Sequence, residues 1–226
     1  MAAGAHQLSA AWGEVPRLRF SVVDSSSVRH AAAPTLEFAL RIDAPDGTPI
    51  RSVLLDVQLQ VTARQRGYDA AAQRQLLELF GAPERWATTL RTLPWTRLTV
   101  VVPPFDASTV VALTVPCSYD LEVSASRYFA ALHDGEVPLE FLFSGSVFYA
   151  TPLGALQTAR IAWDHEVHYR MPVAVWRQAL DAHFPGSAWL RLSRDRFEAL
   201  CAFKAQHAFT SWDAAIDALL AREEAP

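Results

Sequence analysis

The sequence predicts a mainly β (α+β) fold, an antiparallel β-sandwich-like body with one inserted helix and a three-helix C-terminal cap. Three observations lead to this prediction. Apolar and polar residues alternate with a period of two in many runs between residues 18 and 171, as in strands with one buried and one wet face. Short turn sequences such as PDGT at 45–48 separate the runs, which favours antiparallel hairpins. After Pro172 the apolar period changes to about 3.6, which indicates helices.

The predicted strands share a row of apolar residues at every second position. The clearest run is 53–61, where valines and leucines alternate with Asp56, Gln58 and Gln60. Gly145 lies inside a strand-like stretch and predicts a bulge or a bend there. The other predicted strands span 18–22, 36–42, 98–102, 111–117, 119–123, 137–143, 147–149 and 156–171.

Helical spacing appears in two parts of the chain. Residues 70–80 (AAAQRQLLELF) predict a helix that crosses one end of the sandwich, and Gly81 and Pro83 end it. Past Pro172, one apolar stripe starts at Val173, a second helix begins after Ser193, and a third follows 210–213 (TSWD), a capping-box sequence. These three helices are too short to bury a core of their own, so we expect them to dock on the sandwich.

The predicted organisation therefore has four parts. Residues 1–15 form a flexible lead-in, 16–171 the antiparallel β-sandwich-like domain, 172–222 the helical cap and 223–226 a tail. Two distant cysteines, Cys117 and Cys201, and the lack of any CxxC sequence predict reduced thiols instead of a disulfide framework or a zinc site.

Composition limits the classes of partner. The net charge is −4 and the pI is about 6.0, which disfavours nucleic acid as the main partner because phosphate binding needs a concentrated basic surface. No stretch reaches the roughly 20 apolar residues of a membrane span, and the first residues lack the pattern of a signal peptide. We therefore expect a cytoplasmic protein. With nine glycines and no phosphate-binding loop, no nucleotide or other cofactor is expected.

One stretch, 163–170 (WDHEVHYR), contains residue types that carry chemistry. A strand would project Asp164, Glu166 and His168 from one face, where they could hold a divalent metal or serve as acid and base groups. Alternating charges on the wet face of an antiparallel strand explain the same pattern without a site, and we favour that interpretation. His165 points to the apolar side, where a core or edge histidine is the favoured interpretation. No catalytic residue is predicted.

Aromatic residues are the remaining candidates for function. The chain has seven tryptophans, and most should pack in the core or between sheet and helices. Trp86, Trp95 and Trp189 fall in connections outside the regular strands, where aromatic side chains beside arginine are typical of protein interfaces. They are the predicted partner-binding residues.

Several segments together resemble a family of conserved hypothetical proteins common in actinobacteria that has no assigned activity. The resemblance rests on FSVVDSSSVRHAAAPTLEFALRI, LFGAPERWATTLRTLPWT, VVVPPFDASTVVALTVPCSYDLEV, GEVPLEFLFSGSVFY and VWRQALDAHFPGSAWLRL. The resemblance implies that the gene for this protein lies near the genes of uptake-type nickel–iron (NiFe) hydrogenases. It also implies an accessory role in the assembly or maturation of such a complex. It supplies no catalytic residues.

Three functions therefore stay open. The leading hypothesis is a non-enzymatic protein-binding or assembly accessory module, with a hydrogenase-related complex as its protein partner. The alternative is a metal-dependent enzyme or metal-binding protein that uses Asp164, Glu166 and His168. A third option is a carrier that holds a small apolar ligand between its sheets.

Overall fold

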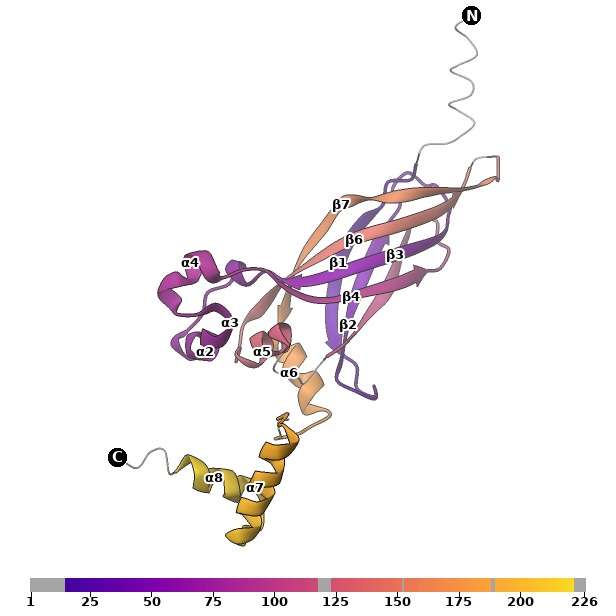
Figure 1. The fold of residues 1–226 in the computed structure, drawn as a ribbon. Coiled ribbons are helices and arrows are strands. Elements are labelled where there is room, and N and C mark those ends of the chain that lie inside the picture. Colours follow the sequence, from indigo (N-terminus) through magenta and orange to yellow (C-terminus); the bar gives the residue numbers. More distant parts are fainter. Residues whose placement is uncertain (1–14, 118–122, 152, 188–189, 222–226) are drawn as a thin grey trace, which may run out of the picture. The chain divides into compact units, whose positions relative to one another are not determined.

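The computed structural model describes residues 15–117, 123–151, 153–187 and 190–221. It confirms the predicted fold class: two antiparallel sheets pack face to face, with helices at one end and at the C-terminus (Figure 1). The three-stranded sheet has the order β1-β2-β5, formed by β1 (Arg19–Ser27), β2 (Thr35–Asp43) and β5 (Ser108–Pro116). The four-stranded sheet has the order β4-β3-β6-β7, formed by β4 (Leu93–Val102), β3 (Ile50–Val61), β6 (Glu136–Ala150) and β7 (Leu156–Pro172).

The alternating rows of apolar residues form the core between the sheets. Every inward residue of β3 from Val53 to Val61 is buried, as predicted. Aromatic rings join the two sheets: Phe38 lies edge-on to Phe141 with centroids 5.2 Å apart, and Phe20 stacks on Phe143 at 4.6 Å. Burial of such rows accounts for most of the stabilisation of a sandwich.

The two sheets also meet along their edge strands. β1 lies beside β7 on one side, and β4 lies beside β5 on the other. Near one end of the first pair, the Tyr169 hydroxyl donates a hydrogen bond to Ser25 Oγ at 3.0 Å.

The helical insertions are more elaborate than the single inserted helix that we predicted. The predicted segment 70–80 forms two short helices, α2 (Ala70–Gln75) and α3 (Leu77–Phe80), which are followed by α4 (Trp86–Thr89). Two 3-10 turns, η1 (Ala63–Gln65) and η2 (Pro83–Arg85), flank them. A further helix that we did not predict, α5 (Ser124–Ala130), precedes β6. The strand predicted over 119–123 lies almost wholly outside the described residues.

The chain divides into two compact units, residues 1–188 and 189–226. Helix α6 (Val173–Asp181) belongs to the first unit, where its Trp176 ring stacks on Phe129 of α5 at 5.6 Å. Helices α7 (Arg194–Gln206) and α8 (Trp212–Leu220) form the second unit. The domain boundaries that we predicted, and the docking of these helices on the sandwich, stay predictions.

Candidate functional site

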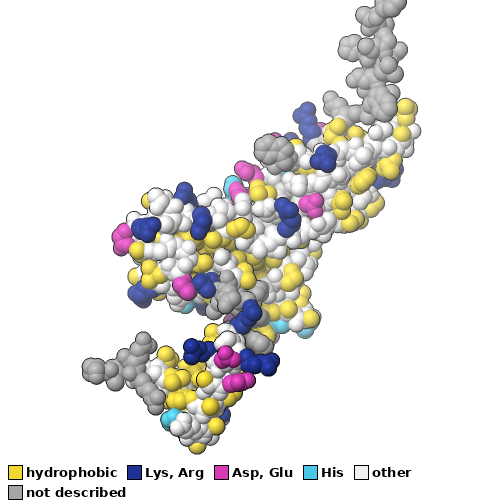
Figure 2. Space-filling model, viewed as in Figure 1, with side chains coloured by type: hydrophobic (Ala, Val, Ile, Leu, Met, Phe, Trp, Pro, Cys, Tyr) yellow, Lys and Arg dark blue, Asp and Glu magenta, His cyan; other side chains and the backbone are white. Residues whose placement is uncertain are grey.

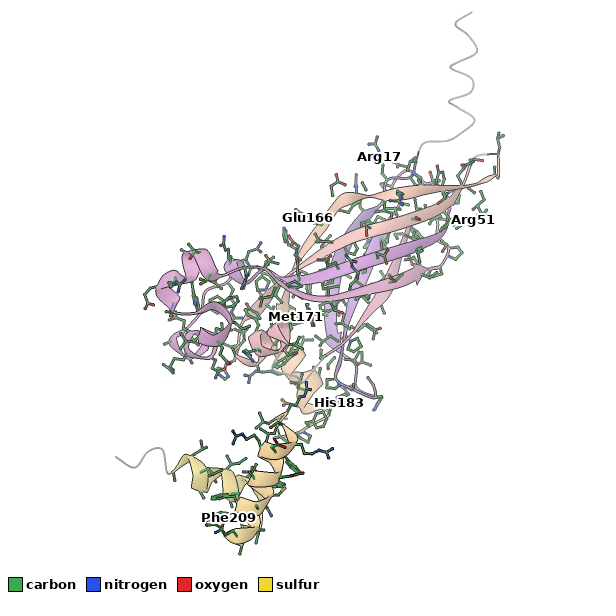
Figure 3. All side chains as sticks on the ribbon, viewed as in Figure 1. Arg17, Arg51, Glu166, Met171, His183 and Phe209 are labelled. Atoms are coloured by element: carbon green, nitrogen blue, oxygen red, sulfur yellow. The ribbon has the colours of Figure 1, made fainter. Side chains whose placement is uncertain are left out.

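The three residues of the predicted metal set lie on the outer face of the four-stranded sheet. Asp164, Glu166 and His168 are all exposed on β7, and Figure 3 shows Glu166 pointing away from the sheet interior. Only His168 has an acidic neighbour across the strands, since its Nδ1 lies 3.8 Å from Oε1 of Glu140 on β6. Within the described residues, no group of three or more His, Cys, Asp or Glu side chains could hold a metal ion. The geometry therefore does not favour the metal alternative.

Two of the predicted partner-binding tryptophans have packing roles in the first unit. Trp86 is 7% exposed, and its Nε1 donates a hydrogen bond to the carbonyl oxygen of Gly81 at 2.8 Å. Trp95 is partly buried, with its ring edge-on to Phe129 at 4.8 Å. Packing against neighbouring residues accounts for much of the surface of both rings. Their role in partner binding stays a prediction, and Trp189 lies outside the described residues.

The second unit, in contrast, leaves apolar side chains in water. Between residues 190 and 221 only Ala215 is buried. Phe197 is 50% exposed, Trp212 is 40% exposed and Leu220 is 58% exposed. We call the exposed apolar residues of the two helices the helix-pair face; it consists of Phe197 on α7 and Trp212, Ile216, Leu219 and Leu220 on α8.

Local contacts hold the helix-pair face in shape. The Phe197 and Trp212 rings lie 5.9 Å apart, and Lys204 Nζ lies 5.4 Å from the centroid of the Trp212 ring. Ser211 caps α8 by accepting a hydrogen bond from the Ala214 backbone N–H at 3.1 Å, which satisfies one of the free donors at the helix start. The spacing of Trp212, Ile216 and Leu219 places them on one side of α8.

The connection between the two helices is a tight C-terminal cap. Ala208 has a positive φ of 54°, and the Phe209 backbone N–H donates a hydrogen bond back to the Lys204 carbonyl at 3.1 Å. This pattern satisfies carbonyls at the end of α7 that would otherwise lack partners. The pair is therefore a defined structure, although it buries little apolar surface.

The second unit carries charged side chains of both signs. Residues 190–221 contain four basic residues and four acidic residues, which cancel at neutral pH. The basic ones are Arg191, Arg194, Arg196 and Lys204; the acidic ones are Asp195, Glu198, Asp213 and Asp217. Figure 2 shows yellow apolar side chains next to blue and magenta ones on the visible side of this unit. Apolar side chains with charged ones beside them are common at protein interfaces.

Sequence reasoning placed these apolar residues in helices but did not identify them as a surface. The spacing of residues along a helix shows that they share a side, and we assumed that this side would dock on the sandwich. The small number of large apolar residues in α7 could have indicated this surface. A helix of mostly polar and alanine residues cannot cover the apolar side of the helix next to it.

Comparison with known proteins gives a family and distant structural likenesses. A protein-family model described as "Family of unknown function (DUF6084)" matches residues 15–226. No curated protein matches the chain. Among solved structures, the CARDB domain of the PF1109 protein from Pyrococcus furiosus, in complex with di-metal ions, is 8% identical over 70% of this chain and 94% of that chain, with a TM-score of 0.27. The putative ApaA protein from Bordetella pertussis is 13% identical over 69% of this chain and 94% of that one, with a TM-score of 0.28.

Among the described helices, none is both long enough and apolar enough to cross a bilayer. The cytoplasmic location and the lack of a nucleic-acid partner stay predictions from composition.

Proposed function

The chain belongs to the DUF6084 family of unknown function, and we propose that it is a non-enzymatic protein-binding module that docks on a partner protein through its helix-pair face. One observation carries the proposal: five large apolar side chains of a folded helix pair are each at least 38% exposed. Large exposed apolar side chains gathered on one helix pair, with charged residues beside them, mark interaction sites on proteins.

The charges around the face favour a protein as the occupant. An anionic membrane surface or a nucleic acid would select a basic rim, whereas here acidic and basic residues are equal in number. A partner that presents an amphipathic helix or an apolar groove matches both the apolar centre and the mixed rim. The resemblance to proteins encoded near nickel–iron hydrogenases makes hydrogenase subunits and their assembly factors the first partners to test.

The test compares two variants with equal added charge. Ile216→Arg/Leu220→Arg places two cations on the helix-pair face. Val101→Arg/Val110→Arg places two cations on exposed apolar positions of β4 and β5 in the first unit. Each full-length protein is used as bait in the native host. The binding constant for any purified partner is then measured by calorimetry, and circular dichroism checks that helix content is unchanged.

We expect a stoichiometric partner with the wild type and the control variant, and an affinity lower by at least about tenfold for the helix-pair variant, because buried apolar contacts at an interface centre carry most binding energy. An unchanged affinity would overturn the proposal. The proposal would also fail if the wild-type chain formed a dimer that the helix-pair variant abolished, since the helix-pair face would then bind a second copy of this chain.

A further inference from the structure

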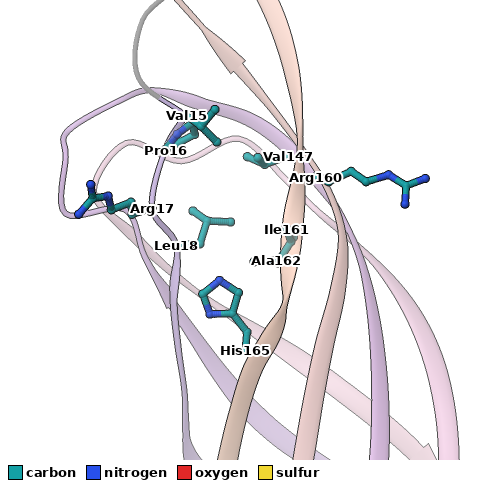
Figure 4. Close-up of a pocket in the computed structure, with 9 residues that line it drawn as sticks. All are labelled: Val15, Pro16, Arg17, Leu18, Val147, Arg160, Ile161, Ala162 and His165. Atoms are coloured by element: carbon teal, nitrogen blue, oxygen red, sulfur yellow. The ribbon is translucent and has the colours of Figure 1, made fainter.

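A cavity opens in the first unit, toward the end of the sandwich away from α4 (Figure 1). It has a volume of about 500 Å³ and lies between the residues that lead into β1 and the first half of β7 (Figure 4). Cavities of this size hold small organic ligands in other proteins. The lining residues are Val15, Pro16, Arg17, Leu18, Val147, Arg160, Ile161, Ala162 and His165.

An irregularity in β7 borders the cavity. Between Ile161 and His165 the strand has two more residues than the paired stretch of β6 from Phe143 to Gly145. Bulges of this kind bend an edge strand and re-aim its side chains, and they are frequent beside binding sites. Farther along the same pair of edge strands, the Tyr169–Ser25 hydrogen bond joins β7 to β1. The two edges are therefore linked by this hydrogen bond beyond the cavity.

The floor of the cavity is apolar, and His165 supplies its polar group. Leu18, Val147 and Ile161 are buried. The His165 ring lies edge-on to Phe20, with centroids 5.3 Å apart, and Figure 4 shows it pointing toward Leu18 and Ile161. Within the described residues, no hydrogen-bond partner of either ring nitrogen is found. A half-buried imidazole with free nitrogens can donate a hydrogen bond to a ligand.

The charge around the cavity is positive. Arg17 and Arg160 stand at its rim, with their guanidinium groups turned outward, and the nine lining residues include no carboxylate. Two acids lie close to lining residues: Asp46, whose Oδ2 accepts a hydrogen bond from the Arg17 backbone N–H at 3.1 Å, and Asp164, which is exposed next to His165 on β7. Two cations at the rim of an apolar cavity favour an anionic ligand group over a cationic one.

From this geometry we infer a second site, independent of the helix-pair face: the β1–β7 cavity binds an amphiphilic carboxylate, with the aliphatic body on Leu18, Val147 and Ile161 and the carboxylate on His165. The hydrogen bond from the imidazole to an ionised carboxylate is of the stronger, charge-assisted kind. The apolar walls supply the remaining affinity through burial of the aliphatic chain.

The test uses decanoate as the probe, with 1-decanol and decyltrimethylammonium as its neutral and cationic counterparts. Calorimetry on the full-length protein measures each affinity. His165→Phe removes the hydrogen bond but keeps an aromatic ring, and His168→Phe changes the outward histidine of the same strand as the matched control. Ala162→Trp fills the cavity from an exposed lining position, which leaves the core unchanged.

We expect saturable binding of decanoate, at least about tenfold tighter than that of the alcohol. His165→Phe should remove that preference, Ala162→Trp should abolish binding of both probes, and His168→Phe should change nothing. A ¹H–¹³C spectrum of the seven histidine rings should show one cross-peak moved by decanoate and missing in His165→Phe. Absence of saturable binding, tighter binding of the cation, or equal affinity in His165→Phe would overturn the inference.

Discussion

At the residue scale, the buried Tyr128 and the partly buried Tyr68 form a contact between segments far apart in the sequence. The Tyr68 hydroxyl donates to the Ala63 carbonyl at 2.6 Å and lies 2.9 Å from the Tyr128 hydroxyl. The Arg66 guanidinium lies over the Tyr68 ring, 5.9 Å from its centroid, and donates to the backbone carbonyls of Asp134 and Glu136. Burial raises the pKa of both phenols above the ordinary value near 10.

This pair predicts a loss of stability at alkaline pH. Because the folded-state pKa values are raised, the folded protein keeps two protons that the unfolded chain releases. The resulting stabilisation is complete below about pH 10, the pKa of tyrosine in an unfolded chain, and is lost as the pH rises above it. The free energy of unfolding of the wild type, measured with urea, should therefore fall steeply between about pH 10 and 11. The free energy of unfolding of the Tyr68→Phe/Tyr128→Phe variant should fall less over this range. Parallel plots of the free energy of unfolding against pH for the two proteins would contradict the prediction.

The two cysteines should differ in reactivity. Burial raises the pKa of the Cys117 thiol to about 12, whereas Cys201 on α7 is partly exposed. Since the thiolate is the reactive form, iodoacetamide at pH 8 should label Cys201 and leave Cys117 unlabelled in the folded protein. Mass spectrometry of the peptides measures both. Labelling in urea, where both thiols should react, is the control, and equal labelling without urea would contradict the burial of Cys117.

At the scale of elements, Gly145 has the strongest steric requirement. Its φ is 139°, and a Cβ at this position would lie 2.0 Å from the carbonyl oxygen of Leu54 on the neighbouring strand β3. Glycine inside a strand often allows such a close approach. The bulge or bend that we predicted here is confirmed by the shift in register between β6 and β7 next to Gly145.

Gly145→Ala should lower the free energy of unfolding by about 3 kcal/mol or more, because the new methyl group must displace backbone in the centre of a sheet. Gly47→Ala is the matched control: Gly47 also has a positive φ, 68°, but nothing lies within 4 Å of an added Cβ. That variant should lose only about 1 kcal/mol, from backbone strain alone. Urea unfolding measures both, and similar losses would show that the collision with Leu54 is relieved by movement of β6.

The strands were predictable from the sequence, and the tertiary contacts of the short helices were not. A period of two identifies the buried face of β3 directly, because half of each strand faces one core. Helix α5 has seven residues, too few for a periodic signal, and Tyr128 and Phe129 are buried there only through contacts with distant segments. The β1–β7 cavity likewise needs the pairing of two edges that lie about 140 residues apart in sequence, as the Tyr169–Ser25 bond does. The exposure of Asp164, Glu166 and His168 followed the predicted wet face of β7.

At the scale of the whole molecule, the two units differ in how much they bury. The inward rows of β2 and β3 have no accessible surface, whereas the helix pair buries a single alanine. Regions with few buried apolar contacts open locally at low free energy, and core strands exchange their amide hydrogens only through global unfolding. Stability should therefore be distributed unevenly along this chain.

Hydrogen exchange followed by mass spectrometry should show this difference. We expect peptides from α7 and α8 to exchange at least about a hundredfold faster than peptides from β2, β3 and β6, because their opening exposes so little apolar surface. Peptides from α6, whose Trp176 is buried against Phe129, are the control for a helix of the first unit and should exchange slowly. Equal protection of α6 and of the helix pair in the isolated protein would mean that the helix-pair face is already covered. Added partner should slow exchange in α7 and α8 alone, and decanoate should slow exchange only around β1 and β7, so one experiment separates the two proposed sites.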